Sequence, residues 1–178
     1  MSLRVIAAAL LVAAVVVLPE APAAQKPAPG PVIVLETTKG TIEIETYPGD
    51  APKTVARILE LMKRNFYNGL RFHRAEKRLV QIGDPASRDM SRQASWGQGG
   101  SGSSIGAAEI TKRRHGPGTV AMAHAGDPKF ADSQFYITKT ATPEFDGKYT
   151  IFGRVTKGLD VVAKIEKTDI LKKAFVKP

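Results

Sequence analysis

The residues that could do chemistry in this sequence are spread over predicted strands and form no compact catalytic motif. In the strand predicted around Arg74, alternation places Phe72 and Arg74 on one face. Gln81 lies in a second apolar strand, and Gln134 and Tyr136 share a face of a third. A guanidinium and two carboxamides can donate hydrogen bonds to a polar substrate. The spacing by itself, however, fits ordinary exposed strand residues better than a site.

Several other chemistries lack the residues they need. His73, His115 and His124 show no metal-binding spacing, such as two histidines on one helix face. The sequence has no Gly-x-Ser-x-Gly elbow for a serine hydrolase. It also has no cysteine, which excludes disulfides, a thiol nucleophile and Cys-based zinc sites. We therefore expect no metal ion and no hydrolytic active site.

A glycine run at residues 97–102 matches the dinucleotide fingerprint Gly-x-Gly-x-x-Gly. That motif binds a nucleotide only where a strand precedes it and a helix follows it. Here a polar loop precedes the run, and residues 103–110 begin a helix poorly. We therefore interpret the run as a loop.

The chain is basic, with a formal net charge of +9 over 178 residues. Such a charge is compatible with a nucleic-acid or membrane-surface partner. The basic residues are scattered, mixed with acidic ones and not interleaved with aromatic side chains. The pattern favours a solvated basic surface, and we expect no nucleic-acid partner.

The first 23 residues have the layout of a secretory signal peptide. Arg4 precedes an unbroken apolar run from Val5 to Leu18, and small residues follow around Ala23. The run has fourteen residues, fewer than the roughly 18 to 20 of a permanent membrane span. We predict cleavage after Ala23 or Ala24 and a periplasmic or secreted protein. The alternative is an uncleaved N-terminal anchor, which would be the chain's only membrane contact.

Residues 24–31 are rich in proline and alanine and predict a flexible lead-in, so that one folded domain covers residues 32–178. This domain begins with a predicted hairpin at residues 32–37 and 41–46. A first helix should start at Pro52 with Asp50 as its cap and stop near residues 68–69. Its apolar stripe consists of Val55, Ile58, Leu59 and Met62.

Further short strands are predicted along the rest of the domain, with a second helix at residues 159–167. Eight strands with hairpin-like connections and two helices predict a mainly β fold. We expect a closed eight-stranded antiparallel β-barrel capped by the two helices. The Gly/Ser-rich residues 84–104 are predicted to form a mobile surface loop. The six further strands are expected at residues 70–74, 79–83, 119–123, 134–138, 150–155 and 169–176.

Short segments along nearly the whole domain resemble cyclophilins and follow one another in that family's order. Each segment is short, but so many in register are highly specific. The family fold is an eight-stranded barrel with two capping helices, in agreement with the pattern above. The segments are ETTKGTI at 36–42, APKTV at 51–55, FYNGL at 66–70, FHR at 72–74, QIGDP at 81–85, GTVAMA at 118–123, SQFYI at 133–137 and DGKYTIFG at 146–153.

The resemblance implies a peptidyl-prolyl cis-trans isomerase, whose reaction needs no cofactor. It implies that Arg74 donates a hydrogen bond to the proline nitrogen when the amide is twisted, and that Gln81 holds a substrate carbonyl. Further residues would bind the peptide around the proline. His124 replaces the family's usual Asn at a position where the backbone makes the contact. The implied substrate-binding residues are Phe72, Leu79, Met122, Ala123, His124, Gln134, Tyr136, Phe145 and Tyr149.

Two departures from the family concern the proline pocket. The segment between Arg74 and Gln81 is one residue shorter, and Arg78 falls where an aromatic residue belongs, so Leu79 would have to compensate. Tyr136 stands where the family usually has Phe, and its hydroxyl needs a partner if it is buried.

The sequence thus predicts an isomerase that acts on X-Pro bonds in exported proteins and assists their folding. Its partners would be proline-containing polypeptides, and we expect a monomer. The altered segment after Arg74 motivates one alternative: a cyclophilin-fold peptide-binding or chaperone module with weak or no turnover.

Overall fold

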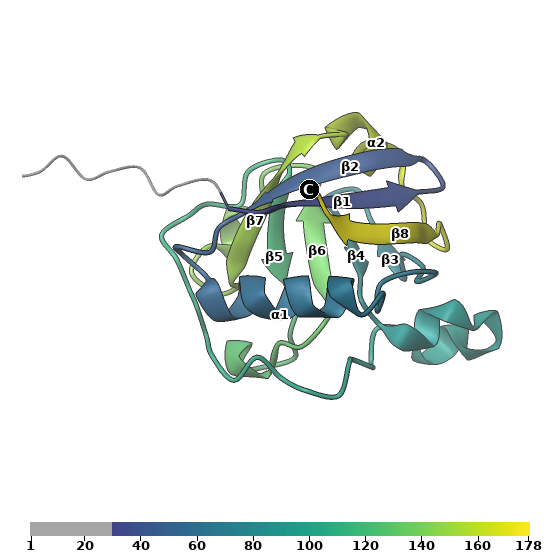
Figure 1. Ribbon diagram of the computed structural model, residues 1–178, viewed down its shortest axis with the longest axis horizontal. Helices are drawn as coiled ribbons and strands as arrows, with labels where there is room; N and C mark the ends of the chain where they lie inside the picture. The colour runs from purple at the N-terminus through teal and green to yellow at the C-terminus, as the bar shows by residue number, and fades with distance from the viewer. Residues whose placement is uncertain (1–29) are drawn as a thin grey trace, which may run out of the picture.

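The computed structural model describes residues 30–178 (Figure 1). The predicted signal peptide and nearly all of the lead-in lie outside these residues. Within the described part, no helix has both the length and the apolar character needed to cross a membrane.

The first two strands form the predicted hairpin. Strand β1 (Val32–Thr37) pairs with β2 (Gly40–Thr46), and the register closes with Thr37 opposite Gly40. Gly40 has φ 138°, and a Cβ there would lie 2.9 Å from a methyl carbon of Val161. Both the turn and the packing of the second helix therefore favour glycine at this position.

The eight strands form one antiparallel sheet, but the predicted closure into a barrel is wrong. The strand order is β3-β4-β6-β5-β7-β2-β1-β8, so β3 and β8 are unpaired edges of an open half-barrel. Figure 1 shows β1, β2 and β8 in front of β4, β5 and β6. The remaining strands are β3 (Arg74–Ala75), β4 (Leu79–Ile82), β5 (Thr119–Met122), β6 (Phe135–Thr138), β7 (Ile151–Lys157) and β8 (Leu171–Val176).

The sheet stays open because the expected strand at residues 70–74 is reduced to the two residues of β3. The residues before β3 instead bond to residues 168–171, which lead into the first residue of β8, outside any continuous ladder. Phe72 N–H donates to the Asp169 carbonyl, Leu171 N–H donates to the Leu70 carbonyl, and one isolated bridge joins Arg71 and Ile170. These bonds hold the two edges near each other without closing the barrel.

Helix α1 (Pro52–Lys63) begins where predicted and lies across one side of the sheet (Figure 1). Val55, Ile58 and Met62 are buried as expected, whereas Leu61 rather than Leu59 completes the buried face. The helix ends before the predicted residues 68–69. Asn65, with φ 57°, leaves the helical region and reverses the chain.

Helix α2 (Leu159–Lys164) is shorter than the predicted 159–167 and lies at the opposite end of the molecule from α1, packed on the same main core (Figure 1). It ends at Ile165, whose backbone is extended with ψ 132°. Val162 and Ile165 are nonetheless buried as their spacing suggested.

Alternation along the strands divides the apolar residues between two faces. On β6, Phe135 and Ile137 enter the main core, while Tyr136 points to the opposite face. On β4, Val80 enters the same core and Leu79 joins Tyr136. The sheet therefore carries a large inner core against α1 and a smaller apolar cluster on its outer face.

The start of α1 differs from the prediction in its cap. Asp50 does not cap the helix, because its carboxylate pairs with the Arg113 guanidinium at 2.6 Å. Instead, both carboxylate oxygens of Glu109 accept the free N–H groups of Lys53 and Thr54, at 2.9 and 2.8 Å. A loop residue 55 positions along the chain from Thr54 thus satisfies the helix N-terminus.

We expect Glu109→Ala to lower the free energy of unfolding by about 1 kcal/mol, the usual cost of losing a helix N-terminal cap. Urea denaturation followed by circular dichroism measures this loss. Glu109→Gln keeps one acceptor oxygen and should lose less. An Ala variant that unfolds at the wild-type urea concentration would contradict this assignment.

Candidate functional site

A groove of about 420 Å³ lies on the outer face of the sheet, above the smaller apolar cluster. Strands β4 and β6 form its floor, the residues after β5 form one side, and the glycine-rich loop forms another. Nine of the eleven sequence-predicted site residues line it: Arg74, Gln81, Leu79, Ala123, His124, Gln134, Tyr136, Phe145 and Tyr149.

Phe72 and Met122 do not line the groove. Both side chains are fully buried in the main core. For Met122 the reason is strand alternation: its neighbours Ala121 and Ala123 belong to the outer cluster, so Met122 must point inward. For Phe72 the predicted shared face with Arg74 fails because the regular strand begins only at Arg74.

A line of polar side chains runs across the groove from Arg74. Arg74 and Gln81 are direct partners across β3 and β4, with Arg74 Nη1 3.4 Å from Gln81 Oε1. Gln81 Nε2 donates to Gln134 Oε1 at 2.8 Å. Gln134 Nε2 in turn donates to the carbonyls of Gly97 and Gly99, at 2.9 and 2.7 Å. Each carboxamide is thus oriented by the next.

Glu76 also binds Arg74, and the sequence analysis missed it. Its carboxylate accepts Arg74 Nε at 2.6 Å and Nη2 at 3.0 Å, which leaves Nη1 for Gln81. The hydrogen bond from Arg74 lowers the pKa of Glu76 below its usual value. The signal that could have indicated this contact is the position of Glu76 two residues after Arg74.

The apolar part of the groove consists of Leu79 and three aromatic rings packed edge to face. The ring centroids of Tyr136 lie 5.8 Å from Phe145 and 5.6 Å from Tyr149, and Phe145 lies 5.2 Å from Tyr149. Such packing fixes the rings and forms an apolar surface within the groove. Leu79 is 2% exposed and takes its place in this cluster despite the shortened segment before it.

The hydroxyl of Tyr136 has the partner that burial demands. Tyr136 is only 3% exposed, and its hydroxyl lies 2.9 Å from Nε2 of His115. Burial raises the pKa of this phenol well above its ordinary value, so that it stays protonated. The sequence pattern around His115 indicates only that it lacks metal-binding spacing. Nothing local indicated that it would meet a residue 21 positions away.

Charged side chains form part of the groove's rim. Arg78 pairs with Glu144, and its guanidinium carbon lies 6.0 Å from the centre of the Phe145 ring. On another side His124 packs on Tyr149, with ring centroids 4.6 Å apart, and its Nε2 lies 3.2 Å from the Lys148 carbonyl. The rim is therefore more polar than the floor.

The glycine-rich loop is a wall of the groove and not a nucleotide site. Gly97 and Gly99 donate their N–H groups to the fully buried Asp84 carboxylate, at 2.6 and 3.3 Å. A Cβ at Gly99 would lie 2.5 Å from an Asp84 oxygen, so no larger residue fits there. Before this wall, residues 84–96 contain two short 3₁₀ helices, η1 (Pro85–Arg88) and η2 (Met90–Ser95), where a mobile loop was predicted.

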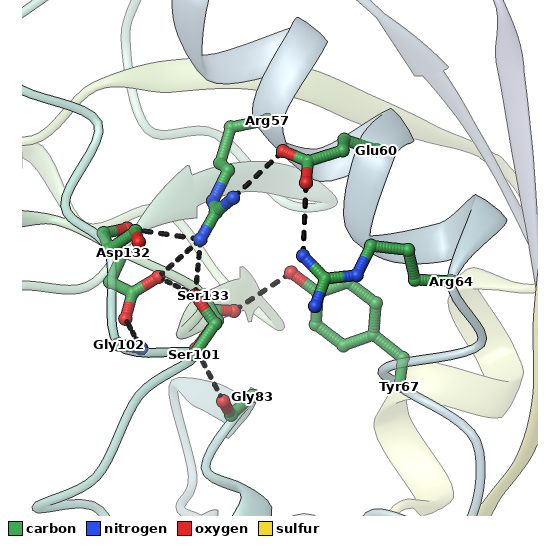
Figure 2. Close-up of polar contacts among 10 residues, drawn as sticks. Arg57, Glu60, Arg64, Tyr67, Gly83, Ser101, Gly102, Asp132 and Ser133 are labelled. Atoms are coloured by element: carbon green, nitrogen blue, oxygen red, sulfur yellow. Dashed lines mark hydrogen bonds and ion pairs between the residues drawn. The ribbon is translucent and has the colours of Figure 1, made fainter.

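A second carboxylate ties the same loop to helix α1. Figure 2 shows Asp132 between Arg57 of α1 and the loop residues Ser101 and Gly102. Next to it, Ser133 donates its hydroxyl to the Gly83 carbonyl at 2.8 Å. These contacts hold the backbone directly before Gln134, and so they help to set the position of that side chain.

No cluster of three or more potential metal ligands occurs within residues 30–178. The groove instead offers hydrogen-bond donors beside an apolar pocket. This combination suits an extended peptide that places a small apolar ring on the apolar cluster and its backbone polar groups beside the hydrogen-bond donors.

Comparison with known proteins agrees with this description. The family model described as "Cyclophilin type peptidyl-prolyl cis-trans isomerase/CLD" matches residues 32–178. A peptidyl-prolyl cis-trans isomerase-like 1 of Rhizopus delemar is 40% identical over 153 residues, covering 81% of this chain and 86% of its own length. A mouse peptidylprolyl isomerase domain and WD repeat-containing protein 1 is 38% identical over 138 residues, which cover 77% of this chain but only 21% of that longer protein.

Among solved structures, a cyclophilin type peptidyl-prolyl cis-trans isomerase of Cryptosporidium parvum has the same fold. It was crystallised in the presence of the dipeptide Ala-Pro. Its TM-score is 0.70 at 25% identity, covering 83% of this chain and 99% of that one.

Replacing Arg74 with alanine should raise the pKa of Glu76 toward its ordinary value, because the charge and hydrogen bonds that favour its ionised form are removed. A carbon-detected NMR titration of the glutamate carboxyls measures this shift. Because the folded-state pKa is lowered, the pair stabilises the fold above the ordinary pKa, and this contribution disappears as the pH falls through the lowered value. The contribution is small, since both side chains are about half exposed.

Glu60 is the matched control for this titration. Its pKa is lowered by Arg57 and Arg64 on helix α1, and it should not respond to the change at Arg74. An unchanged Glu76 pKa in the variant would show that the two side chains are not paired in solution.

Proposed function

The chain belongs to the cyclophilin-type peptidyl-prolyl cis-trans isomerases, and we propose that it acts on X-Pro bonds in exported proteins and so assists their folding. The observation that carries this proposal is the position of Arg74 and Gln81, paired across two strands, beside the apolar pocket of Leu79, Tyr136 and Phe145.

The reaction is a rotation about an amide bond, in which no covalent bond forms or breaks, and it needs no cofactor. Rotation about a peptide bond has a barrier of roughly 18–20 kcal/mol, because amide resonance must be broken. At an X-Pro bond the uncatalysed step takes about 10 to 100 seconds at 25 °C and can limit folding. A catalyst therefore has to stabilise the twisted amide more than either planar form.

Arg74 is suited to that task. When the amide twists, the proline nitrogen loses conjugation and its lone pair can accept a hydrogen bond. The guanidinium donates to this lone pair only in the twisted state, so the bond lowers the barrier and does not merely tighten binding. Glu76 and Gln81 hold the guanidinium from two sides, which reduces the reorganisation needed when substrate arrives.

The other groove residues bind the peptide on either side of the proline. Gln81 donates to a substrate carbonyl, while Gln134 and the backbone at Ala123 and His124 hold the extended chain. The proline ring sits on the aromatic cluster. The similar Cryptosporidium parvum protein, crystallised in the presence of Ala-Pro, supports an X-Pro ligand for this groove.

Two features favour a second candidate, a peptide-binding or chaperone module with weak or no turnover. Glu76 occupies two donor atoms of Arg74, and the Arg78–Glu144 pair makes one rim of the pocket charged. If the carboxylate held Arg74 away from the proline nitrogen, the groove would bind peptides without accelerating the rotation.

Export is supported by the sequence of residues 1–23, with their single arginine, apolar run and small residues near position 23. Outside the cytoplasm, slow X-Pro rotation would limit the folding of newly exported chains, and an isomerase that needs no ATP would act there directly.

In Arg74→Ala we expect the catalysed exchange of a short X-Pro peptide to fall by about 10²- to 10³-fold, the typical cost of losing one transition-state donor. Two-dimensional exchange NMR measures the interconversion, and peptide-induced shifts measure binding, which should persist. Arg88→Ala, which alters an arginine outside the groove, is the control. Wild-type protein that binds the peptide without accelerating exchange would replace the isomerase with the second candidate.

The full chain expressed in a bacterium should be recovered outside the cytoplasm with Ala24 or Gln25 as its first residue. Leu11→Arg, which interrupts the apolar run, should keep the protein in the cytoplasm. N-terminal sequencing of the fractionated cells gives the answer. Full-length protein in the membrane fraction would support the uncleaved anchor, and full-length wild-type protein in the cytosol would contradict export.

A further inference from the structure

A polar relay runs from the floor of the groove to the surface, and two of its three residues, His115 and Asp146, take no part in the reaction described above. It consists of Asp146, His115 and Tyr136. The His115 side chain is 0% exposed, with Nδ1 2.9 Å from Asp146 Oδ1 and Nε2 2.9 Å from the Tyr136 hydroxyl. The relay therefore joins a carboxylate at the surface to an aromatic residue that lines the groove.

The hydrogen bonds fix the proton positions when His115 is neutral. The Asp146 carboxylate can only accept, and the backbone N–H of His115 also donates to it at 2.8 Å. These hydrogen bonds lower the pKa of Asp146, which keeps it ionised. Nδ1 of the imidazole must then carry the hydrogen. Nε2 is left as an acceptor, and the Tyr136 hydroxyl donates to it.

Protonation of His115 reverses the second hydrogen bond. Nε2 becomes a donor to the Tyr136 oxygen, and the hydroxyl hydrogen has to turn away from the imidazole. Within residues 30–178, Nε2 is the only hydrogen-bond partner of this hydroxyl. The released hydrogen thus lacks a protein acceptor, and it belongs to a residue that lines the groove.

The other groups around His115 are aromatic rings or charged residues with contacts of their own. A charge on His115 would therefore affect the groove mainly through the Tyr136 hydroxyl. The Phe145 ring lies nearly perpendicular to the imidazole, with ring centroids 5.9 Å apart, and the Tyr136 ring lies nearly parallel to it, with centroids 6.0 Å apart. Arg114, next to His115 in the chain, lies 3.4 Å from the other Asp146 oxygen. Of the charged groups nearby, Glu144 pairs with Arg78, and Lys148 offers only its carbonyl, to His124.

We propose that His115 is a positioning residue of the proline pocket: through Tyr136 it sets whether the pocket floor presents a hydrogen-bond acceptor or a donor, so that proline peptides bind more weakly when the imidazole is protonated. A proline ring offers no acceptor for a hydroxyl hydrogen, and an unpaired donor in an apolar contact is unfavourable. This role rests on the proposed function in one respect, that proline peptides bind in the groove; it does not require that they are isomerised there.

The test measures peptide binding and the state of His115 in the same samples. The probe is the tetrapeptide Ala-Ala-Pro-Ala, acetylated and amidated so that the peptide itself does not titrate. Its dissociation constant is determined by NMR shift titration at several pH values between about 8 and 5. The ring signals of His115 report its protonation.

We expect the dissociation constant to rise about tenfold, equivalent to about 1.4 kcal/mol, with a midpoint that coincides with the titration of His115. The exchange rate at saturating peptide should stay constant, because the relay affects binding and not the Arg74 hydrogen bond. In Tyr136→Phe and in His115→Gln the affinity should become independent of pH, as neither variant can reverse the hydrogen bond. A merely structural role for His115 would not produce this pattern.

His124 is the matched control, because it is the other imidazole at the groove. His124→Asn should retain the pH dependence. An affinity that stays constant while His115 titrates, or a dependence that disappears in His124→Asn, would overturn the proposal, and the wild-type measurement decides this even if a relay variant does not fold. Isomerisation is read separately by exchange: pH-dependent binding without turnover would refute the proposed function and leave the relay intact.

Discussion

The groove depends on the alternation of side chains along β4, β5 and β6. Each strand must supply the main core with one set of residues and the groove with the set between them. Phe135 and Ile137 anchor β6 in the core, which leaves Tyr136 on the opposite face. The groove residues are therefore held by the packing of their immediate neighbours, and a shift of register by one residue would exchange core and groove.

Hydrogen bonds orient the groove side chains that the strands place on one face. The sheet delivers Gln81 and Gln134 to one face, but their carboxamides would be free to rotate without the glycine carbonyls. Asp84 fixes those carbonyls in place by binding the N–H groups of the same loop. A buried carboxylate outside the groove thus determines which atoms the groove presents. This arrangement explains why the loop is rich in glycine, since Gly99 has no room for a side chain.

Local patterns predicted the parts of the structure that local physics controls. The hairpin, the start of α1 at Pro52 and the shared face of Gln134 and Tyr136 follow from turn chemistry and strand periodicity. The resemblance to cyclophilins predicted that Arg74 and Gln81 belong to one site, and the two residues are indeed direct partners across β3 and β4. No rule of spacing along the sequence predicts this.

Three of the failures share one cause, the dependence on distant partners. Asp50 looked like a cap, but Arg113 binds it and Glu109 caps the helix. His115 gave no local sign of its contact with Tyr136. The barrel closure failed because the residues before β3 bond to an irregular segment, a choice that depends on the tertiary fold and not on periodicity.

The open sheet has a further consequence, for unwanted association. An uncovered edge strand is a template on which another chain can add a strand, and this is a common route to aggregation. Here one edge, β3, is only two residues long. The other, β8, carries the exposed Lys172 and Lys173, and the residues just before it already bond to the segment at residues 69–72. Neither edge therefore offers a long, uncharged strand to which another chain could add. We expect the open sheet to resist edge-to-edge aggregation even at high protein concentration.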